Sequence, residues 1–357
     1  MYKIFAVNPG STSTKLGLFE DEKPIISVKI EHPSHELNRF PKIIDQYPLR
    51  KNAMIEFLKK NGVEISSLSA VVGRGGLLKP FPSGTYHVDV KMIEDLSSAK
   101  YGEHASNLGA LLAFGFEWDY NIPSYVVDPV GVDEMMDIAR LSGLKEISRK
   151  SQWHALNSRA VVRQVCRNEG WDFKKENFVS AHLGGGITIA ALERGRSVDV
   201  TNGFDAGPFT PERAGAIPTL ELVKICFSGK YDQETILRLL VGKGGLVNYL
   251  GTSNLIEIER RIDQGDDYAK MVLNGMAYQV AKEIGGMVAV LCGKVKCIVI
   301  TGGCAHSKRL VKKIIDHIKC FSAVFVVPGE DELGSLAQGA LRVLCGEEIP
   351  LEYCKLA

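Results

Sequence analysis

Apolar and polar positions run in the same order twice along the chain, about half a chain apart. An apolar strand at 3–8 leads into a Gly/Ser turn at 10–13, and two further strands follow at 15–19 and 24–28. The same order of strand, glycine-rich turn, strand and strand returns over 177–200. Self-similarity of this kind is the sequence signature of a repeated structural unit. The pattern predicts a duplicated domain, each copy opening with a three-stranded hairpin sheet.

Behind each hairpin, further strands alternate with segments whose apolar residues have helical spacing. The strands are expected at 69–72, 123–127, 296–300 and 323–327, and the clearest helices at 50–60, 103–116 and 333–344. This alternation predicts an α/β fold, in which ligands bind at the carboxyl ends of the strands. Because the glycine-rich turns of both halves lie at such ends, we expect the halves to face each other across one cleft.

The two halves are divided near Lys175, after a polar link at 171–175. This gives an N-terminal domain of residues 1–175 and a C-terminal domain of residues 176–357. A chain of 357 residues is long for one core and suits two domains. A helix-rich insert over 220–291 enlarges the second half, and the last helix is free to pack back onto the first domain.

Composition and charge narrow the functional class. The chain is 45% apolar and 24% charged, as in ordinary soluble globular proteins. A net charge of +1, without a basic stripe and interleaved aromatic residues, argues against nucleic-acid binding. The apolar runs are too short to cross a membrane, and the eight cysteines form no CxxC pair. We therefore expect a cytoplasmic protein with reduced thiols.

The first hairpin turn carries short polar side chains beside a flexible backbone, which suits a phosphate or a Mg²⁺ ion. The candidate residues are Asn8, Gly10, Ser11 and Ser13. The stretch 8–15 fails as a P-loop, which needs glycine before its lysine and Ser or Thr after it, because the chain has Thr14 and Leu16 there. The alternative is a polar hairpin turn without a ligand.

The second hairpin turn combines a histidine with three glycines. The candidate residues are His182, Gly184, Gly185 and Gly186, together with Thr301, Gly302 and Gly303 after a later strand. Glycine lets backbone N–H groups approach a polyphosphate, and an adenine or ribose can lie against the Thr-Gly-Gly backbone. His182 is placed to donate a hydrogen bond to a phosphoryl oxygen. The alternative is a histidine satisfied within the core.

Three charged residues are the next candidates. Arg213 lies in a loop, 209–218, that small residues and two prolines hold tightly, as a guanidinium aimed at a phosphoryl group requires. Arg74, between glycines at 73–76, is a second clamp for a carboxylate or a phosphate, or else a solvated turn residue. Asp128 directly follows a strand and is the leading catalytic carboxylate.

Acidic and histidine residues complete the candidates. Glu330 and Glu332 are suited to Mg²⁺, which proteins hold with carboxylates and substrate phosphates. Asp331 between them is equally suited to cap the helix that follows. His104 and His154 lie on predicted helices and can equally be structural.

The repeated halves and paired turns are similar to the superfamily of actin, sugar kinases and heat-shock chaperone ATPases. Within it, the chain resembles the acetate and butyrate kinase family nearly end to end. The segments that carry the resemblance are 7–13, 182–186, 213–218, 248–253 and 277–285. Segments 103–107 and 130–134 are nearer to the butyrate kinases. The resemblance implies two duplicated RNase H-like, actin-like ATPase domains with a central cleft.

The resemblance also implies reversible transfer of the ATP γ-phosphoryl group to a short-chain fatty acid, giving acyl phosphate and ADP, with Mg²⁺ as cofactor. The catalytic residues that the resemblance implies are Arg213, His182, Asp128, Arg74 and His154. The acyl site that it implies holds Arg74, His104 and Asn107. It also implies that Asn8 and Glu332 place Mg²⁺, with Glu330 less favoured. Acetate kinases have a longer segment around Arg74, which aligns either with their first-domain arginine or with a later histidine. A homodimer or larger homo-oligomer is implied.

The chemistry agrees with a carboxylate acceptor, since a carboxylate is ionised at pH 7 and needs no general base. Direct in-line transfer then depends on positioning and charge neutralisation. One alternative is an acetate or propionate kinase, because acyl chains differ by single methylene groups. A sugar or polyol kinase using Asp128 as base is another, and an ATP-switched chaperone or filament protein is a third.

Overall fold

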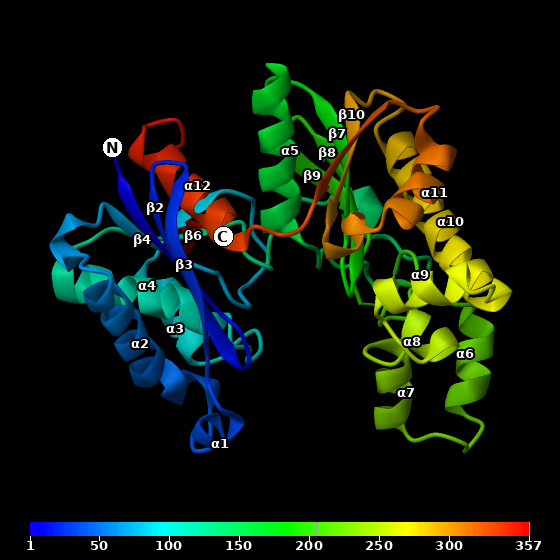
Figure 1. The fold of residues 1–357 in the computed structure, drawn as a ribbon, viewed down its shortest axis with the longest axis horizontal. Helices are drawn as coiled ribbons and strands as arrows, with labels where there is room; N and C mark the ends of the chain where they lie inside the picture. The colour runs from blue at the N-terminus through cyan, green and yellow to red at the C-terminus, as the bar shows by residue number, and fades with distance from the viewer. Residues whose placement is uncertain (205, 357) are drawn as a thin grey trace. The chain divides into compact units, whose positions relative to one another are not determined.

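The computed structural model describes residues 1–204 and 206–356. They form two compact units, each with its own sheet (Figure 1). The first unit joins Met1–Asp133 to Asp331–Ala357, and the second is Glu134–Glu330. The chain therefore leaves the first unit once and returns to it once. None of the helices in the described part of the chain has the length and apolar character needed to span a bilayer.

The sheet of the first unit has the strand order β12-β5-β6-β4-β1-β2-β3. The strands are β1 (Lys3–Pro9), β2 (Ser13–Glu20), β3 (Lys23–Glu31), β4 (Ala70–Gly73), β5 (Thr85–His87), β6 (Ser124–Val127) and β12 (Leu351–Glu352). Strands β1, β2 and β3 form the predicted antiparallel hairpin sheet, and β4 and β6 add to it in parallel. The carboxyl ends of β1, β4 and β6 therefore share one edge.

Helices cover both faces of this sheet. They are α1 (Ser34–Leu37), α2 (Tyr47–Lys60), α3 (Val90–Ser97), α4 (Asn107–Tyr120) and α12 (Glu332–Leu344), with 3₁₀ turns η1 (Ile43–Gln46), η2 (Ile65–Ser67) and η5 (Tyr353–Lys355). On one face, the ring of Phe5 stacks on Phe57 of α2 at 5.7 Å and meets Phe116 of α4 at 6.0 Å. On the other, α12 packs so closely that Gly339 lies on the side chain of Val127.

The sheet of the second unit has the order β11-β10-β7-β8-β9. The strands are β7 (Asn177–Leu183), β8 (Ile187–Glu193), β9 (Arg196–Val200), β10 (Cys297–Gly302) and β11 (Ala323–Pro328). Their order and directions repeat β6-β4-β1-β2-β3 of the first unit. The duplication expected from the sequence is thus confirmed strand by strand.

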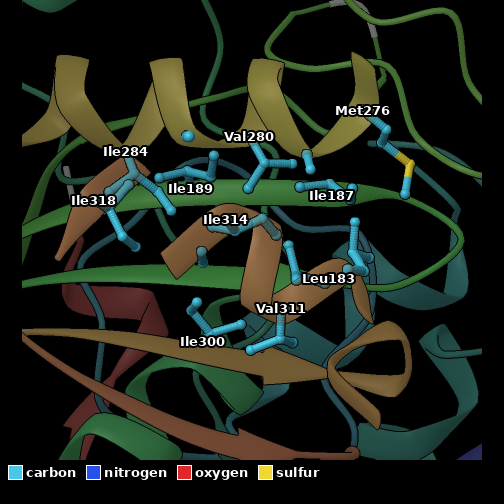
Figure 2. Packing of buried hydrophobic residues seen from close by; sticks show 14 of the residues in the cluster. Leu183, Ile187, Ile189, Met276, Val280, Ile284, Ile300, Val311, Ile314 and Ile318 are labelled. Carbon is cyan, nitrogen blue, oxygen red and sulfur yellow. The ribbon is translucent and has the colours of Figure 1, made fainter. Parts of the chain in front are cut away.

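A large apolar core lies between this second sheet and two of its helices (Figure 2). The helices of the unit are α5 (Ala155–Glu169), α6 (Thr219–Cys226), α7 (Gln233–Leu240), α8 (Gly245–Leu250), α9 (Leu255–Asp263), α10 (Asp267–Val290) and α11 (Lys308–Ile318), with 3₁₀ turns η3 (Asp137–Arg140) and η4 (Gly303–His306). Ile189 and Ile300 of the sheet belong to this core together with Val280 and Ile284 of α10 and Val311 and Ile314 of α11. The predicted helix-rich insert is therefore α6 to α10.

The division between the units falls at Asp133, not near Lys175. Residues after Asp133 already bond to the second sheet: Glu134 Oε2 accepts from Ser197 N at 2.8 Å, and Met136 N donates to Val198 O at 2.9 Å. Helix α5 then packs on β7 and β10. The polar link at 171–175 is a turn inside the second unit. The last long helix, α12, belongs to the first unit, which agrees with the possibility that the last helix packs back onto the first domain.

Candidate functional site

The first hairpin turn joins β1 to β2 and is closed by a hydrogen bond from Gly10 N to Ser13 O at 2.7 Å. Ser13 is buried beneath the turn, whereas Ser11 and Thr12 are exposed at its tip. Within the described chain, the N–H groups of Ser11 and Thr12 donate to no acceptor. The turn therefore presents open donors to solvent, which is the arrangement an anion needs.

Glu332, the first residue of α12, gathers three side chains of the first unit. Its Oε2 accepts from Asn8 Nδ2 at 2.5 Å and lies 3.4 Å from Lys15 Nζ. Its Oε1 lies 4.0 Å from Arg74 Nη1. The predicted pair of Asn8 and Glu332 is thus brought together, whereas Glu330 belongs to the second unit.

Asp128 lies at the end of β6, next to the end of β4 that carries Arg74. Its backbone has φ of +37°, a region that non-glycine residues rarely adopt. The side chain is 3% exposed, and Oδ1 accepts from Gly84 N at 2.8 Å. Strained backbone of this kind is typical of functional sites, where the surroundings hold a residue in one geometry.

His104 and Asn107 precede and begin α4. His104 Nδ1 accepts from Ser106 N at 3.2 Å, so the neutral ring carries its proton on Nε2. Burial, and next the charge of Arg74, lower the pKa of His104 below its ordinary value of 6.5. Asn107 is buried, its Oδ1 accepts from Leu77 N at 2.9 Å and its Nδ2 donates to Gly102 O at 2.9 Å. Its amide therefore holds the turn after β4.

His182 ends β7 and is held from two sides. Asn157 Nδ2 donates to its Nδ1 at 2.9 Å, which puts the proton of the neutral ring on Nε2. That Nε2 lies 3.0 Å from Glu330 Oε1. The ring of His154 stacks on it at 3.9 Å between centroids, and His154 Nδ1 lies 2.9 Å from Thr188 Oγ1. The two predicted histidines are thus in direct contact.

The glycine turn after His182 accommodates Arg213. A methyl group on Gly186 would overlap the guanidinium, which stacks over the ring of Phe204 at 4.7 Å and donates to the carbonyl of Gly203. The loop before it is tied to the turn, because Thr210 Oγ1 donates to Gly185 O at 2.6 Å. Burial lowers the pKa of Arg213, although the group stays charged at neutral pH.

The Thr-Gly-Gly element begins at the end of β10, beside β7. Thr301 Oγ1 accepts from Asn157 Nδ2 at 3.2 Å and donates to Gly329 O at 3.2 Å. Gly302 has φ of +92°, and a Cβ there would overlap the backbone of Leu183. No atom lies within 4 Å of a Cβ built at Gly303. The turn is therefore fixed at Gly302 and open at Gly303.

A sequence model described as the acetokinase family matches residues 145–326, just over half of the chain. The chain belongs to the acetokinase family. This confirms the family expected from the motifs, while the nearer likeness to butyrate kinases stays a prediction.

Solved structures agree with this acetokinase assignment at the level of the fold. Acetate kinase from Porphyromonas gingivalis has a TM-score of 0.79 and 20% identity, covering 96% of this chain and 100% of that one. A propionate kinase from Francisella tularensis subsp. tularensis has a TM-score of 0.75 and 18% identity, covering 95% and 99%. A ROK family protein from Streptococcus pneumoniae has a TM-score of 0.54 and 10% identity, covering 97% and 100%. The fold expected from the sequence is thus confirmed.

Asn157 and Thr188 of this acetokinase chain contact the predicted histidines but were not predicted. Asn157 lies three residues after His154 on the first turn of α5, a spacing that puts both on one helix face. That spacing is a signal the sequence does contain. Thr188 lies directly opposite His182 in the β7–β8 pairing, so the hairpin register would have placed it.

The oxygen groups of the first unit fit Mg²⁺. Glu332 supplies a carboxylate next to Asn8, whose Oδ1 accepts no hydrogen bond from the described residues. Residues 1–204 and 206–356 contain no group of three or more His, Cys, Asp and Glu able to hold a metal alone. Mg²⁺ usually keeps one or two carboxylates and takes its other ligands from phosphates and water, so a pair of this kind suffices.

Proposed function

We propose that this acetokinase-family chain is a carboxylate kinase that phosphorylates a short-chain fatty acid, with butyrate or a branched analogue as acceptor. Mg-ATP is the donor, and acyl phosphate and ADP are the products. The observation that carries the proposal is the Arg213 guanidinium lying on Gly186 of the turn that follows His182. An arginine and a histidine on one glycine turn are suited to a phosphoryl group in transfer.

The proposed step is in-line displacement. An oxygen of the ionised carboxylate forms a bond to the γ-phosphorus as the bond to the bridging oxygen breaks, and ADP leaves with that electron pair. No proton is removed, so Arg213 and His182 act by donating to the equatorial oxygens. His182 donates from Nε2, because Asn157 occupies Nδ1. Asn8 and Glu332 would hold Mg²⁺, which would neutralise phosphate charge when bound.

The acceptor is assigned to the first unit. Arg74 and His104 bind its carboxylate, with His104 neutral at pH 7 and donating from Nε2. Asp128 is the catalytic carboxylate on the neighbouring strand end, and Asn107 holds the turn that carries Arg74. His154 supports His182 through the ring stack.

A hydroxylamine trap tests the proposal. Mg-ATP is supplied with C2 to C5 carboxylates and glycerol, and acyl hydroxamate is read beside ADP. Hydroxamate that peaks at C4 is the expected result. ADP without hydroxamate would overturn the carboxylate kinase and favour a hydroxyl acceptor.

An acetate or propionate kinase is the second candidate function. The observation in its favour is that an acetate kinase and a propionate kinase are among the solved structures of similar fold, with TM-scores of 0.79 and 0.75 over nearly the full length of both chains. One methylene in an apolar pocket changes discrimination by about 10- to 200-fold, so the panel separates these acceptors. A peak at C2 or C3 would select this candidate.

A homodimer or larger homo-oligomer is part of the proposal. Helix α6 and the residue that follows it expose four large apolar side chains: Leu220 at 77%, Val223 at 52%, Ile225 at 43% and Phe227 at 87%. Apolar patches of this kind favour association. We expect light scattering after size exclusion to give at least twice the chain mass, and Phe227→Lys to lower it. A monomeric wild type would contradict this expectation.

A further inference from the structure

A buried arginine lies beneath the first hairpin turn. Arg50 of α2 has no exposed surface, and it uses all of its guanidinium N–H groups in hydrogen bonds. Nη1 donates to Ser13 O at 2.9 Å and to Thr14 Oγ1 at 3.0 Å, and Nη2 donates to Gly10 O at 2.9 Å. Arg50 therefore holds both ends of the turn.

The remaining partner of Arg50 is neutral. Gln46 Oε1 accepts from Nη2 at 2.9 Å and from Nε at 3.2 Å. Across residues 1–204 and 206–356, no carboxylate pairs with Arg50. Burial lowers its pKa to about 10, so the group remains charged at neutral pH. A buried charge without a counter-ion is unfavourable, and an anion bound nearby would relieve it.

One of the two free donors of the turn lies on a peptide group that Arg50 contacts. The carbonyl of Gly10, which accepts from Arg50, shares its peptide with the N–H of Ser11. A cation on the carbonyl oxygen polarises the peptide and strengthens its N–H as a donor. The N–H groups of Ser11 and of its neighbour Thr12 are the ones left open to solvent among the described contacts of this turn.

We propose that Arg50 is a positioning residue for phosphoryl binding, whose buried charge makes the first hairpin turn an anion site. This inference rests on the proposed function and deepens it, because it identifies the source of positive charge beneath the turn. Arg50 touches no ligand itself. It acts through the carbonyls of Gly10 and Ser13, which it holds in place and polarises.

Gln46→Glu separates the charge of Arg50 from its bracing role. The variant keeps the acceptor oxygen and gives Arg50 a carboxylate partner inside the fold. If Arg50 only braced the turn, the Gln46→Glu protein would bind Mg-ATP with wild-type affinity. We expect Mg-ATP to bind about tenfold more weakly by titration calorimetry, because the turn loses its net positive charge. KM for Mg-ATP should rise while KM for the carboxylate stays unchanged.

The control is Asn52→Asp, which adds the same charge on the exposed face of the same helix. It should leave affinity and melting temperature unchanged. A Gln46→Glu variant that folds and binds Mg-ATP within twofold of wild type would overturn the inference. If that variant does not fold, Gln46→Leu serves instead: it keeps the charge, so it should lower the melting temperature yet bind Mg-ATP within twofold. A large loss of affinity there would overturn the inference too.

The wild type separates failure of this inference from failure of the proposed function. If the wild type binds Mg-ATP but forms no hydroxamate, the proposed carboxylate kinase function is overturned. The ratio of the Mg-ATP affinities of Gln46→Glu and wild type would still decide the role of Arg50. If hydroxamate forms and Gln46→Glu binds Mg-ATP with wild-type affinity, only the proposed role of Arg50 is overturned. A wild type that binds neither Mg-ATP nor pyrophosphate would overturn both.

Discussion

At the scale of single residues, the glycine turn of the second unit positions side chains as well as backbone. A Cβ on Gly186 would overlap the guanidinium of Arg213, and one on Gly184 would lie 3.2 Å from His182 Nε2. The side chains of Arg213 and His182 can lie against the turn because Gly186 and Gly184 have no Cβ. Removing the guanidinium and displacing it are therefore separate experiments on one contact.

Arg213→Ala removes the guanidinium. We expect kcat to fall by about a thousandfold, as for other arginines that stabilise a phosphoryl group in transfer. The hydroxamate assay at saturating Mg-ATP measures it. Arg196→Ala, at an exposed arginine of β9, is the control and should keep full activity. A loss below tenfold in Arg213→Ala would refute the assigned role.

Gly186→Ala keeps Arg213 but displaces it. The added methyl meets the flexible end of the arginine rather than backbone, so the fold should absorb it. We expect kcat to fall by about a hundredfold, the usual result of misplacing a catalytic group by an ångström, with little change in melting temperature. Gly286→Ala in α10, where no atom lies within 4 Å of the new Cβ, is the matched control. Equal activity of the two variants would contradict the prediction.

At the scale of secondary structure, the sequence predicts the helices and strands themselves better than the tertiary contacts between them. The two hairpins, the parallel strands and helices α2, α4 and α12 are predicted because apolar spacing is a local property. Arg50 was not predicted as a site residue, since its acceptors at Gly10 and Ser13 lie about 40 positions earlier. The boundary was misplaced because α5 packs on a strand that follows it in the chain. Contacts of this kind depend on the folded arrangement.

The end of β3 carries a histidine that should make the first unit sensitive to acid. Burial, and next the charge of Arg50, lower the pKa of His32, whose Nε2 lies 2.8 Å from Thr14 Oγ1. The unfolded chain then binds the proton more readily, so this stability is present above pH 6.5 and is lost as the pH falls below it. His104 contributes with the same sign.

Replacing this histidine should reduce the acid sensitivity. We expect His32→Gln to flatten the fall in melting temperature between pH 7.5 and pH 5.5, approximate limits chosen to span the ordinary histidine pKa. His35→Gln, at an exposed histidine three residues on, should keep the wild-type slope. Equal slopes in wild type and His32→Gln would show that His32 is protonated as readily in the folded state as in the unfolded one.

At the scale of the whole molecule, one unit is continuous in sequence and the other is not. Residues 134–330 contain a complete sheet with helices on both faces, whereas the first unit needs residues from both ends of the chain. Helix α12 covers the face of the first sheet that α2 and α4 leave open, with Leu333 3.2 Å from a Cβ at Gly17. The two units should therefore differ in whether they fold as fragments.

We expect a fragment of residues 134–330 to fold alone, with a cooperative thermal transition by circular dichroism. A fragment of 176–330 follows the boundary predicted from the sequence but lacks α5, and it should not fold cooperatively. Residues 1–133 without α12 should also fail, because one face of the sheet is uncovered. Cooperative unfolding of 176–330 would show that α5 is dispensable and that the boundary near Lys175 is the better one.

The position of α12 reverses the order in which the two units can be completed during synthesis. Strands β1 to β6 of the first unit leave the ribosome first, but the helix that closes their second face emerges after the whole second unit. At usual translation rates, about 200 intervening residues take on the order of 10 to 40 s. Throughout that interval the apolar face around Val127 is open, while the second unit can fold as soon as it emerges. We therefore expect chaperones to bind mainly the first unit, although it is the half of the protein that is made first.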